Sequence, residues 1–239
     1  MFRGETDMEK FTKERLNQIR LMHYLSFIPE LTPSSRVLDL GCGEGYIDKF
    51  LKTKYGCEVW CIDLKREESH EWIRDFKMQG IAFLFCDIAR VKYLPFPSDY
   101  FNLVLFCEVL EHLITQHPPK YLFREIYRVL KLNGILFLST PNMAELVKRL
   151  RLLIGKHPIP RVHFKDEDRP YAGHYREYTL DELKYLLSEM GFKILKIRLR
   201  DYSPYYGDKT IIRKLYSMIL KLVPTFRTTI QISAMKVKE

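Results

Sequence analysis

The sequence predicts an α/β fold in which a mostly parallel sheet of seven strands is covered by helices on both faces. Short apolar runs, each typical of a buried strand, alternate with helical stretches at the spacing of βαβ units. The first run, residues 36–40, leads straight into a turn that contains Gly41, Gly43 and Gly45. Two later runs end in Asp63 and Asp87, at the edge where open α/β sheets bind ligands.

Composition places the chain among globular proteins. Its 239 residues suit one domain with additions, and a hydrophobic fraction of 46% supplies a core. The N-terminus is charged and no apolar run is long enough to span a bilayer, so we expect a cytoplasmic protein without a signal peptide. The five cysteines form no paired zinc spacing, and we expect buried thiols in a reducing compartment.

The glycine turn is the first candidate binding element. Glycines let the backbone turn tightly and approach a ligand, and the helix after the turn directs free N–H groups at an anionic group. The spacing Gly-x-Gly-x-Gly differs from that of dinucleotide folds and is weak evidence alone. Asp39 lies inside the strand, where a carboxylate has no packing role, and Asp63 follows the turn by about 20 residues, the place of a ribose-binding acid.

At these residues the sequence resembles class I S-adenosylmethionine (SAM)-dependent methyltransferases. In that family the glycine loop holds the methionine part of SAM, and the second acid holds the ribose. An acid after the third strand often meets the adenine amino group, although Asp87 could equally cap the next turn. The resemblance implies SAM as the cofactor, bound by Asp39, Gly41, Cys42, Gly43, Asp63, Leu64, Cys86, Asp87, Ile88 and Cys107.

The remaining elements follow in chain order. A capping box at 6–9 begins a helix that ends near Ser26, before Pro29 and Pro33. Residues 94–104 resemble the family's entry into its fourth strand, with Asn102 in place of the usual Asp, which puts a structural hydrogen bond in doubt. Strands are expected at 36–40, 58–63, 81–86, 101–106, 135–140, 192–199 and 228–237, with helices at about 46–53, 67–78, 118–130, 143–154, 179–190 and 209–222. In the family one edge strand is antiparallel.

We expect a single methyltransferase domain over residues 1–239. It divides into an N-terminal helical cover (1–33), a SAM-binding core (34–142), a helical and loop lid insertion (143–178) and a C-terminal part with the acceptor side (179–239).

The segment after the fourth strand should carry the chemistry, because it faces the cofactor. Imidazoles titrate near neutral pH and can take a proton from an acceptor hydroxyl. We therefore predict His112 and His174 as catalytic residues, together with Glu108 and Glu111.

The same four residues could alternatively hold Mg²⁺ or Mn²⁺. The pattern Glu-x-x-Glu-His over residues 108–112 is similar to a pattern in ubiquinone-biosynthesis O-methyltransferases. The segment from His174 to Thr179 is similar to a segment in the metal-using small-RNA 3′-terminal ribose O-methyltransferases. The first pattern is also widespread in small-molecule methyltransferases without a known metal. We therefore expect no metal, and keep Glu108, Glu111, His112 and His174 as the alternative ligand set.

The net charge of +9 lies entirely in the C-terminal part. Residues 143–239 hold 20 Lys and Arg against 11 Asp and Glu, whereas residues 1–142 hold 19 of each. Helices at 143–154 and 209–222 are basic and amphipathic. Such stripes usually pack their apolar face on the core and leave the charges to solvent, and the other interpretation is contact with phosphate, RNA or an anionic membrane surface.

The sequence thus predicts a SAM-dependent methyltransferase that acts on a hydroxyl of a small acceptor, phosphorylated or lipid-linked. One alternative is a metal-assisted RNA ribose 2′-O-methyltransferase. Another is a non-catalytic SAM-binding subunit that serves a partner protein. RNA and an anionic membrane surface are less favoured partners than a small acceptor.

Overall fold

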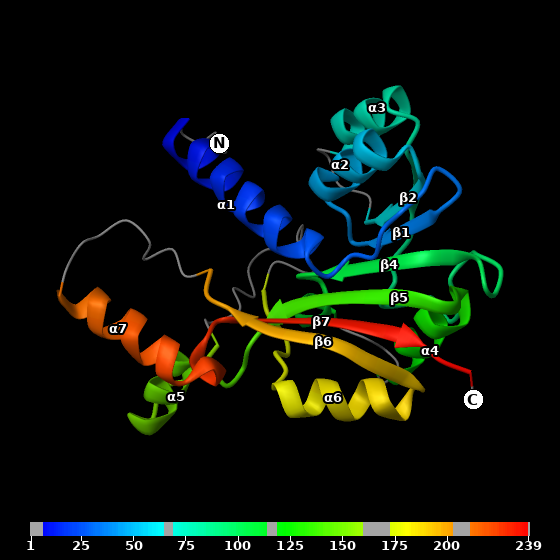
Figure 1. The fold of residues 1–239 in the computed structure, drawn as a ribbon. Coiled ribbons are helices and arrows are strands. Elements are labelled where there is room, and N and C mark those ends of the chain that lie inside the picture. The colour runs from blue at the N-terminus through cyan, green and yellow to red at the C-terminus, as the bar shows by residue number, and fades with distance from the viewer. Residues whose placement is uncertain (1–6, 65–68, 114–118, 160–172, 203–210, 239) are drawn as a thin grey trace.

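The computed structural model describes residues 7–64, 69–113, 119–159, 173–202 and 211–238. Seven strands form one sheet in the order β3-β2-β1-β4-β5-β7-β6 (Figure 1). Their bounds are β1 Arg36–Leu40, β2 Glu58–Asp63, β3 Ala82–Phe85, β4 Phe101–Cys107, β5 Leu130–Pro141, β6 Phe192–Arg200 and β7 Thr229–Lys236. The first five strands in chain order pair in parallel, and β7 runs antiparallel to both β5 and β6. The predicted mostly parallel fold is confirmed, with the antiparallel strand one place in from the edge.

Helices lie on both faces of this sheet (Figure 1). Their bounds are α1 Asp7–Leu25, α2 Tyr46–Tyr55, α3 Ser69–Met78, α4 Lys120–Val129, α5 Leu146–Leu153, α6 Leu180–Glu189 and α7 Ile211–Leu222, with 3₁₀ turns η1 Leu110–His112 and η2 Pro224–Phe226. Among the described residues, none of these helices combines the length and the apolar character needed to cross a bilayer.

The hydrophobic core forms two layers, because side chains along the buried strands point alternately to the two faces of the sheet. Val37 of β1 faces the layer that also contains Tyr24 and Phe27 beside α1. Leu38 of the same strand faces the other layer, which contains Phe123 of α4 and Leu183 of α6. Successive side chains of a strand point to opposite faces, so each central strand contributes to both layers.

Two local expectations can be compared with side-chain contacts. Asn102 accepts hydrogen bonds from the backbone N–H of Arg36 at 2.9 Å and from Lys131 Nζ at 3.1 Å, so the amide oxygen supplies the structural hydrogen bond that was in doubt. The capping box of α6 is present, with Thr179 and Glu182 each bonding to the backbone of the other.

The prediction for helix 143–154 needs a correction. Leu150, Leu153 and Ile154 were expected to pack on the core, but they are exposed, and Lys148 of the same helix is buried. The proposed division of the chain at residues 33, 142 and 178 stays a prediction, and the central part of the expected lid, 160–172, lies outside the described residues.

Candidate functional site

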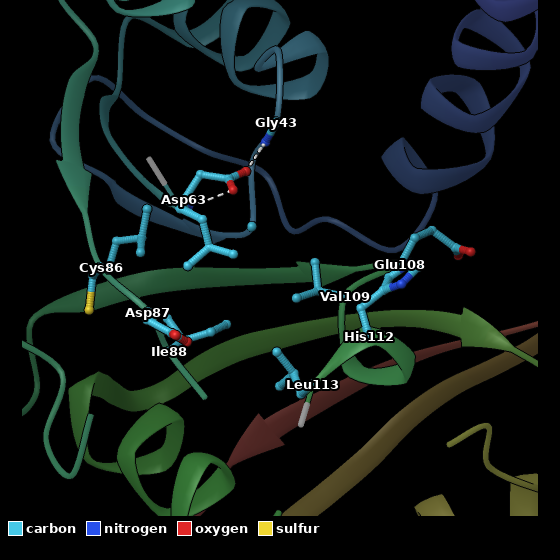
Figure 2. A pocket seen from close by; sticks show the side chains of 12 residues that line it. Gly43, Asp63, Cys86, Asp87, Ile88, Glu108, Val109, His112 and Leu113 are labelled. Atoms are coloured by element: carbon cyan, nitrogen blue, oxygen red, sulfur yellow. Dashed lines mark hydrogen bonds between the residues drawn. The ribbon is translucent and has the colours of Figure 1, made fainter. Parts of the chain in front are cut away.

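A pocket of about 380 Å³ lies at the carboxyl ends of the parallel strands β1, β2, β3 and β4. Figure 2 shows the side chains around it. The loops that follow these strands supply its lining, as the topology of an open α/β sheet requires. The lining residues are Gly41, Gly43, Ile62, Asp63, Leu64, Cys86, Asp87, Ile88, Glu108, Val109, His112 and Leu113.

The glycine turn is shaped by left-handed backbone at all three of its glycines. A Cβ on Gly41 would lie 2.4 Å from Val109 Cγ2, and one on Gly45 would lie 2.1 Å from Phe76 Cε1. These two glycines therefore allow close packing of the chain. A Cβ on Gly43 would meet nothing within 4 Å, and Gly43 is part of the pocket lining.

Asp63 fixes the turn against the end of β2. One carboxylate oxygen accepts the N–H of Gly43 at 2.7 Å, and the other accepts the N–H of Leu64 at 2.7 Å (Figure 2). The carboxylate also lines the pocket, and each of its oxygens can accept more than one hydrogen bond. Its position suits hydroxyl groups of a ligand.

Asp87 caps the next turn and also lines the pocket, and its contact with adenine stays a prediction. Its Oδ1 accepts the N–H of Ala89 at 3.0 Å, which is the expected turn cap. Its Oδ2 lies 3.3 Å from Arg90 Nε. The residue also lines the pocket, together with Cys86 and Ile88.

Three predicted cofactor residues, Asp39, Cys42 and Cys107, are not part of the pocket lining. Asp39 is buried below the glycine turn, beside the carboxyl of Asp48 on α2. Burial and the neighbouring Asp48 raise the pKa of Asp39 well above its ordinary value. Burial likewise raises the pKa of Asp48 to about 6. Two neighbouring carboxyls that are both buried do not readily ionise together, so this pair holds a proton near neutral pH.

Glu108 turns away from the other predicted catalytic residues. Its φ of 57° is left-handed, and its N–H donates to Ser139 O at 2.7 Å. Its carboxylate accepts the Ser139 hydroxyl at 2.5 Å, and that hydroxyl also accepts from Tyr24 at 3.3 Å. Figure 2 shows the carboxylate pointing to the side opposite Asp63 and Asp87.

Glu111, His112 and His174 converge at the edge of the pocket. One ligand atom from each lies within 4.8 Å of the other two, and the imidazole centroids are 4.9 Å apart. Glu111 is buried and accepts the Thr140 hydroxyl at 2.9 Å. Burial, with a further contribution from Glu108, raises the pKa of Glu111 to about 8. The structure thus brings together three of the four predicted catalytic residues.

Hydrogen bonds fix how the two imidazoles present their nitrogens. His112 Nδ1 lies 3.1 Å from the carbonyl of Gly173, an acceptor, so Nδ1 carries the hydrogen. His174 Nδ1 lies 2.8 Å from Glu177 Oε1. Burial raises the pKa of Glu177, but hydrogen bonds from His174 and Lys148 outweigh it and the pKa is lowered, so Glu177 is an ionised acceptor. In the neutral form of each ring, Nε2 is therefore the nitrogen without a hydrogen, and Nε2 of His112 lies 3.9 Å from Glu111 Oε1.

The cluster has the donors that a divalent cation would need. Two imidazole nitrogens and one carboxylate, each held by a second hydrogen bond, form a ligand set that suits Mn²⁺ or Zn²⁺ better than Mg²⁺. Glu108 does not join this set in the part of the chain that the structure describes, because its backbone directs it to Ser139. The four-residue ligand set predicted from the sequence is thus reduced to three.

A family model described as a methyltransferase domain matches residues 8–197, which is more than half of the chain. The chain belongs to this methyltransferase family. Its sheet order and its structural neighbours show the fold of class I SAM-dependent methyltransferases.

Curated relatives of the methyltransferase act on different atoms. A glycine/sarcosine/dimethylglycine N-methyltransferase of Actinopolyspora halophila is 26% identical over 74% of this chain and 29% of its own length. A ubiquinone biosynthesis O-methyltransferase of Xanthomonas oryzae is 31% identical over 65% of this chain and 64% of its own. The chain spans less than two thirds of the length of the relatives it matches.

Solved structures share the fold. A SAM-dependent methyltransferase from Archaeoglobus fulgidus is 21% identical, with a TM-score of 0.63 over 93% of this chain and 94% of that one. A methyltransferase of Haloferax volcanii, solved with the activator Trm112, is 17% identical, with a TM-score of 0.65 over 95% of this chain and 92% of that one.

SAM fits the pocket of the methyltransferase chemically. A Cβ is absent at Gly43, the Asp63 carboxylate lies in the pocket lining, and Ile62, Leu64, Ile88 and Leu113 provide apolar surface for a flat base. Sequence reasoning did not name Ile62, Val109 and Leu113 as site residues. Their positions next to the acids and histidines were the available signal.

Proposed function

We propose that this methyltransferase transfers the methyl group of SAM to a hydroxyl of a small acceptor, and that phosphorylated or lipid-linked acceptors are the favoured class. The observation that carries the proposal is the pair of imidazoles of His112 and His174, whose ring centroids lie 4.9 Å apart, with His112 in the lining of the pocket. A hydroxyl must lose its proton during methyl transfer, and an imidazole in reach of it can accept that proton.

The pocket residues would align the donor. In this proposal the Gly41 to Gly43 loop holds the methionine part of SAM, Asp63 the ribose hydroxyls, and Asp87 with Ile88 the adenine. Methyl transfer from a sulfonium needs alignment of nucleophile, carbon and sulfur more than covalent help from the protein. Asp39 would act indirectly in this proposal, by supporting the glycine turn from below.

The reaction can be written with this chain's own groups. The hydroxyl oxygen forms a bond to the methyl carbon while the carbon–sulfur bond breaks, and Nε2 of His174 or His112 accepts the hydroxyl proton. The products are the methyl ether, S-adenosylhomocysteine and an imidazolium. Glu177 would hold His174 in the required tautomer through the contact at Nδ1.

A polar cluster beside Glu108 is the candidate acceptor side. The Tyr202 hydroxyl accepts from Gln231 Nε2 at 2.8 Å and lies 2.9 Å from His23 Nδ1. The guanidinium of Arg20 lies 5.5 Å from the Tyr202 ring centroid. Gln231 of β7 pairs with Ser139 of β5, and the Ser139 hydroxyl donates to Glu108, which supports a cluster on the Glu108 side of the pocket. Aromatic and hydrogen-bonding groups of this kind suit a ring or a sugar.

The second candidate function is metal-assisted methylation of an RNA ribose hydroxyl. The three-residue donor set of Glu111, His112 and His174 favours it. A cation bound there would lower the pKa of a coordinated hydroxyl. The basic C-terminal part would then contact the RNA phosphates, and binding would weaken steeply with salt.

Labelled SAM tests the proposal. The protein is incubated with labelled SAM and with separate lipid, small-metabolite and RNA fractions of a cell lysate. Label in a lipid or small-metabolite fraction, lost in His174→Ala but kept in the matched variant His157→Ala, supports the proposal, because His157 is exposed and outside the cluster. Label confined to RNA overturns it in favour of the second candidate.

A further inference from the structure

Two helices present their apolar faces to solvent. On α5, Val147, Leu150 and Ile154 follow helical spacing and are exposed, and Leu153 beside them is 81% exposed. On α7, Leu215, Met218, Ile219 and Leu222 follow the same spacing, and Leu222 is 74% exposed. Apolar stripes of this kind usually pack on a core, but those of α5 and α7 are exposed to solvent.

The orientation of α5 has a specific cause. Its Lys148 is buried, pairs with Glu177, and also bonds to Asn142 O at 3.1 Å and lies 3.5 Å from Glu145. A buried lysine needs such partners, and by satisfying them the helix rests on its polar side. Its leucines are consequently turned outward.

The two helices belong to one end of the molecule (Figure 1). The guanidinium of Arg149 on α5 lies 5.0 Å from the ring centroid of Phe226, in the η2 turn directly after α7. Asn142 Nδ2 donates to Thr225 O and Arg227 O, and Arg227 Nε donates to Leu220 O. The pairing of Pro141 with Thr229 places α5 and η2 at the carboxyl end of β5, the same end of the sheet as the pocket.

The positive charge of this surface favours an anionic partner. Neither 146–156 nor 211–227 contains an Asp or a Glu. Exposed cations flank the apolar stripes, namely Arg149, Arg151, Lys156, Lys214 and Lys221. A second copy of the same surface would bring like charges together, and RNA offers no apolar layer for the leucines. A bilayer with anionic headgroups offers both an apolar interior and negative charge.

We propose that α5 and α7 form a docking surface that lies on an anionic membrane. The leucine and isoleucine side chains enter the boundary between headgroups and acyl chains, and the flanking lysines and arginines contact lipid phosphates. Docking at this end brings the pocket close to the bilayer. The inference stands on exposure and charge, and it does not depend on which acceptor the enzyme methylates.

The test is flotation of the full chain with vesicles of phosphatidylcholine mixed with phosphatidylglycerol, beside vesicles of phosphatidylcholine alone. We expect at least roughly tenfold more protein on the anionic vesicles, and less as salt is raised, because several cations each contribute about 1 kcal/mol near such a surface.

Matched variants test whether the vesicles bind the surface of α5 and α7 and not another part of the protein. The double variant Leu153→Glu and Leu222→Glu should lower vesicle binding at least roughly tenfold, since it removes two apolar anchors and adds repulsive charge. Leu132→Glu, at a half-exposed leucine near the start of β5, should bind vesicles like the unmodified protein. Lys156→Glu and Lys221→Glu should weaken binding, whereas Lys77→Glu on α3 should not.

Affinity for SAM is measured on every variant and should stay unchanged, so loss of docking is distinguished from loss of fold or of cofactor binding. Equal binding to both vesicle types, no binding to either, or equal loss in Leu132→Glu would overturn the proposal. So would a dimer that the Leu153→Glu and Leu222→Glu variant dissociates, since that would assign the surface to a second copy.

Discussion

Lys148 and Glu177 form an ion pair that joins helix α5 to the imidazole of His174. Lys148 Nζ bonds to one carboxylate oxygen of Glu177, and the other oxygen lies 2.8 Å from His174 Nδ1. Lys148, which turns the leucines of α5 outward, is therefore connected through Glu177 to the predicted catalytic imidazole of His174. The proposed docking helix and the predicted catalytic imidazole therefore share one structural support.

This chain of contacts predicts the effect of Glu177→Gln. The amide cannot act as an ionised acceptor for both Lys148 and His174, so the imidazole loses its fixed orientation. We expect kcat to fall roughly ten- to a hundredfold, the range found when a partner that orients a functional histidine is removed, while the Kd for SAM stays the same. Steady-state kinetics and calorimetry measure the two quantities. The matched control is Glu189→Gln, at an exposed acid of α6, and an equal loss of kcat in both variants would refute the assignment.

Replacing Lys148 instead should lower the free energy of unfolding more than it lowers the catalytic rate. Lys148→Met would leave the Glu177 carboxylate buried without its partner, which costs roughly 3–5 kcal/mol. Urea denaturation should show a loss of this order. A loss below about 1 kcal/mol would mean that the pair does not anchor α5.

The glycines offer a matched pair for cofactor binding. Gly43 and Gly56 both have left-handed backbone, with φ of 54° and 65°, and a Cβ on either would meet no atom closer than 4.0 Å. Alanine at either position should cost a similar free energy of unfolding, about 1–2 kcal/mol. Only Gly43→Ala places a methyl group in the pocket, so only this variant should weaken SAM binding, by roughly tenfold or more. Equal SAM affinity in the two variants would place the cofactor elsewhere.

The shared proton of Asp39 and Asp48 predicts how stability varies with pH. Burial raises the pKa of both acids in the folded protein, and of Asp48 to about 6, so the folded state binds more protons than the unfolded state above about pH 4. The contribution of this pair to the free energy of unfolding is therefore largest at low pH, and it falls as the pH rises through about 6.

Asp48→Asn should remove much of this loss, because the amide is neutral at every pH and can donate to Asp39. The variant should gain stability relative to the unmodified protein between pH 4 and pH 7, on the order of 1–3 kcal/mol at neutral pH. Thermal unfolding across this range measures the difference. A variant that is less stable at pH 7 than at pH 4, relative to the unmodified protein, would contradict the shared proton.

Chelation distinguishes the two ways in which Glu111, His112 and His174 can act. If the imidazoles accept the proton themselves, as proposed, turnover should be unchanged after dialysis against EDTA. Turnover that EDTA abolishes and Mn²⁺ restores would contradict this and support the cation-assisted candidate. SAM binding measured in parallel excludes unfolding as the cause of a loss.

Much of the fold could be predicted because its signals are local. The run from Arg36 to Leu40, the glycines after it and the acid at Asp63 lie within one βαβ unit, and the sheet order follows from such units and their right-handed connections. The end of β4 also identified the segment that holds Glu108 and His112, because its place at the carboxyl edge is fixed by topology.

What could not be predicted depends on long-range contacts. The stripe of leucines on α5 reads as a core face, and only the pairing of Lys148 with Glu177, 29 positions along the chain, turns it to solvent. Glu108 was grouped with Glu111 and His112 by its spacing. Its left-handed backbone and the Ser139 hydroxyl direct it elsewhere, and neither feature is visible in the sequence.

The central claim is that the pocket beside the glycine turn and Asp63 binds SAM, and calorimetry tests it most directly. SAM and S-adenosylhomocysteine are titrated into the unmodified protein and into Asp63→Ala. We predict saturable binding of both ligands by the unmodified protein and an affinity at least roughly tenfold weaker in the variant, because it loses both the ribose acceptor and the support of the Gly43 N–H. No binding heat from either ligand, or equal affinity in the two proteins, would contradict the claim.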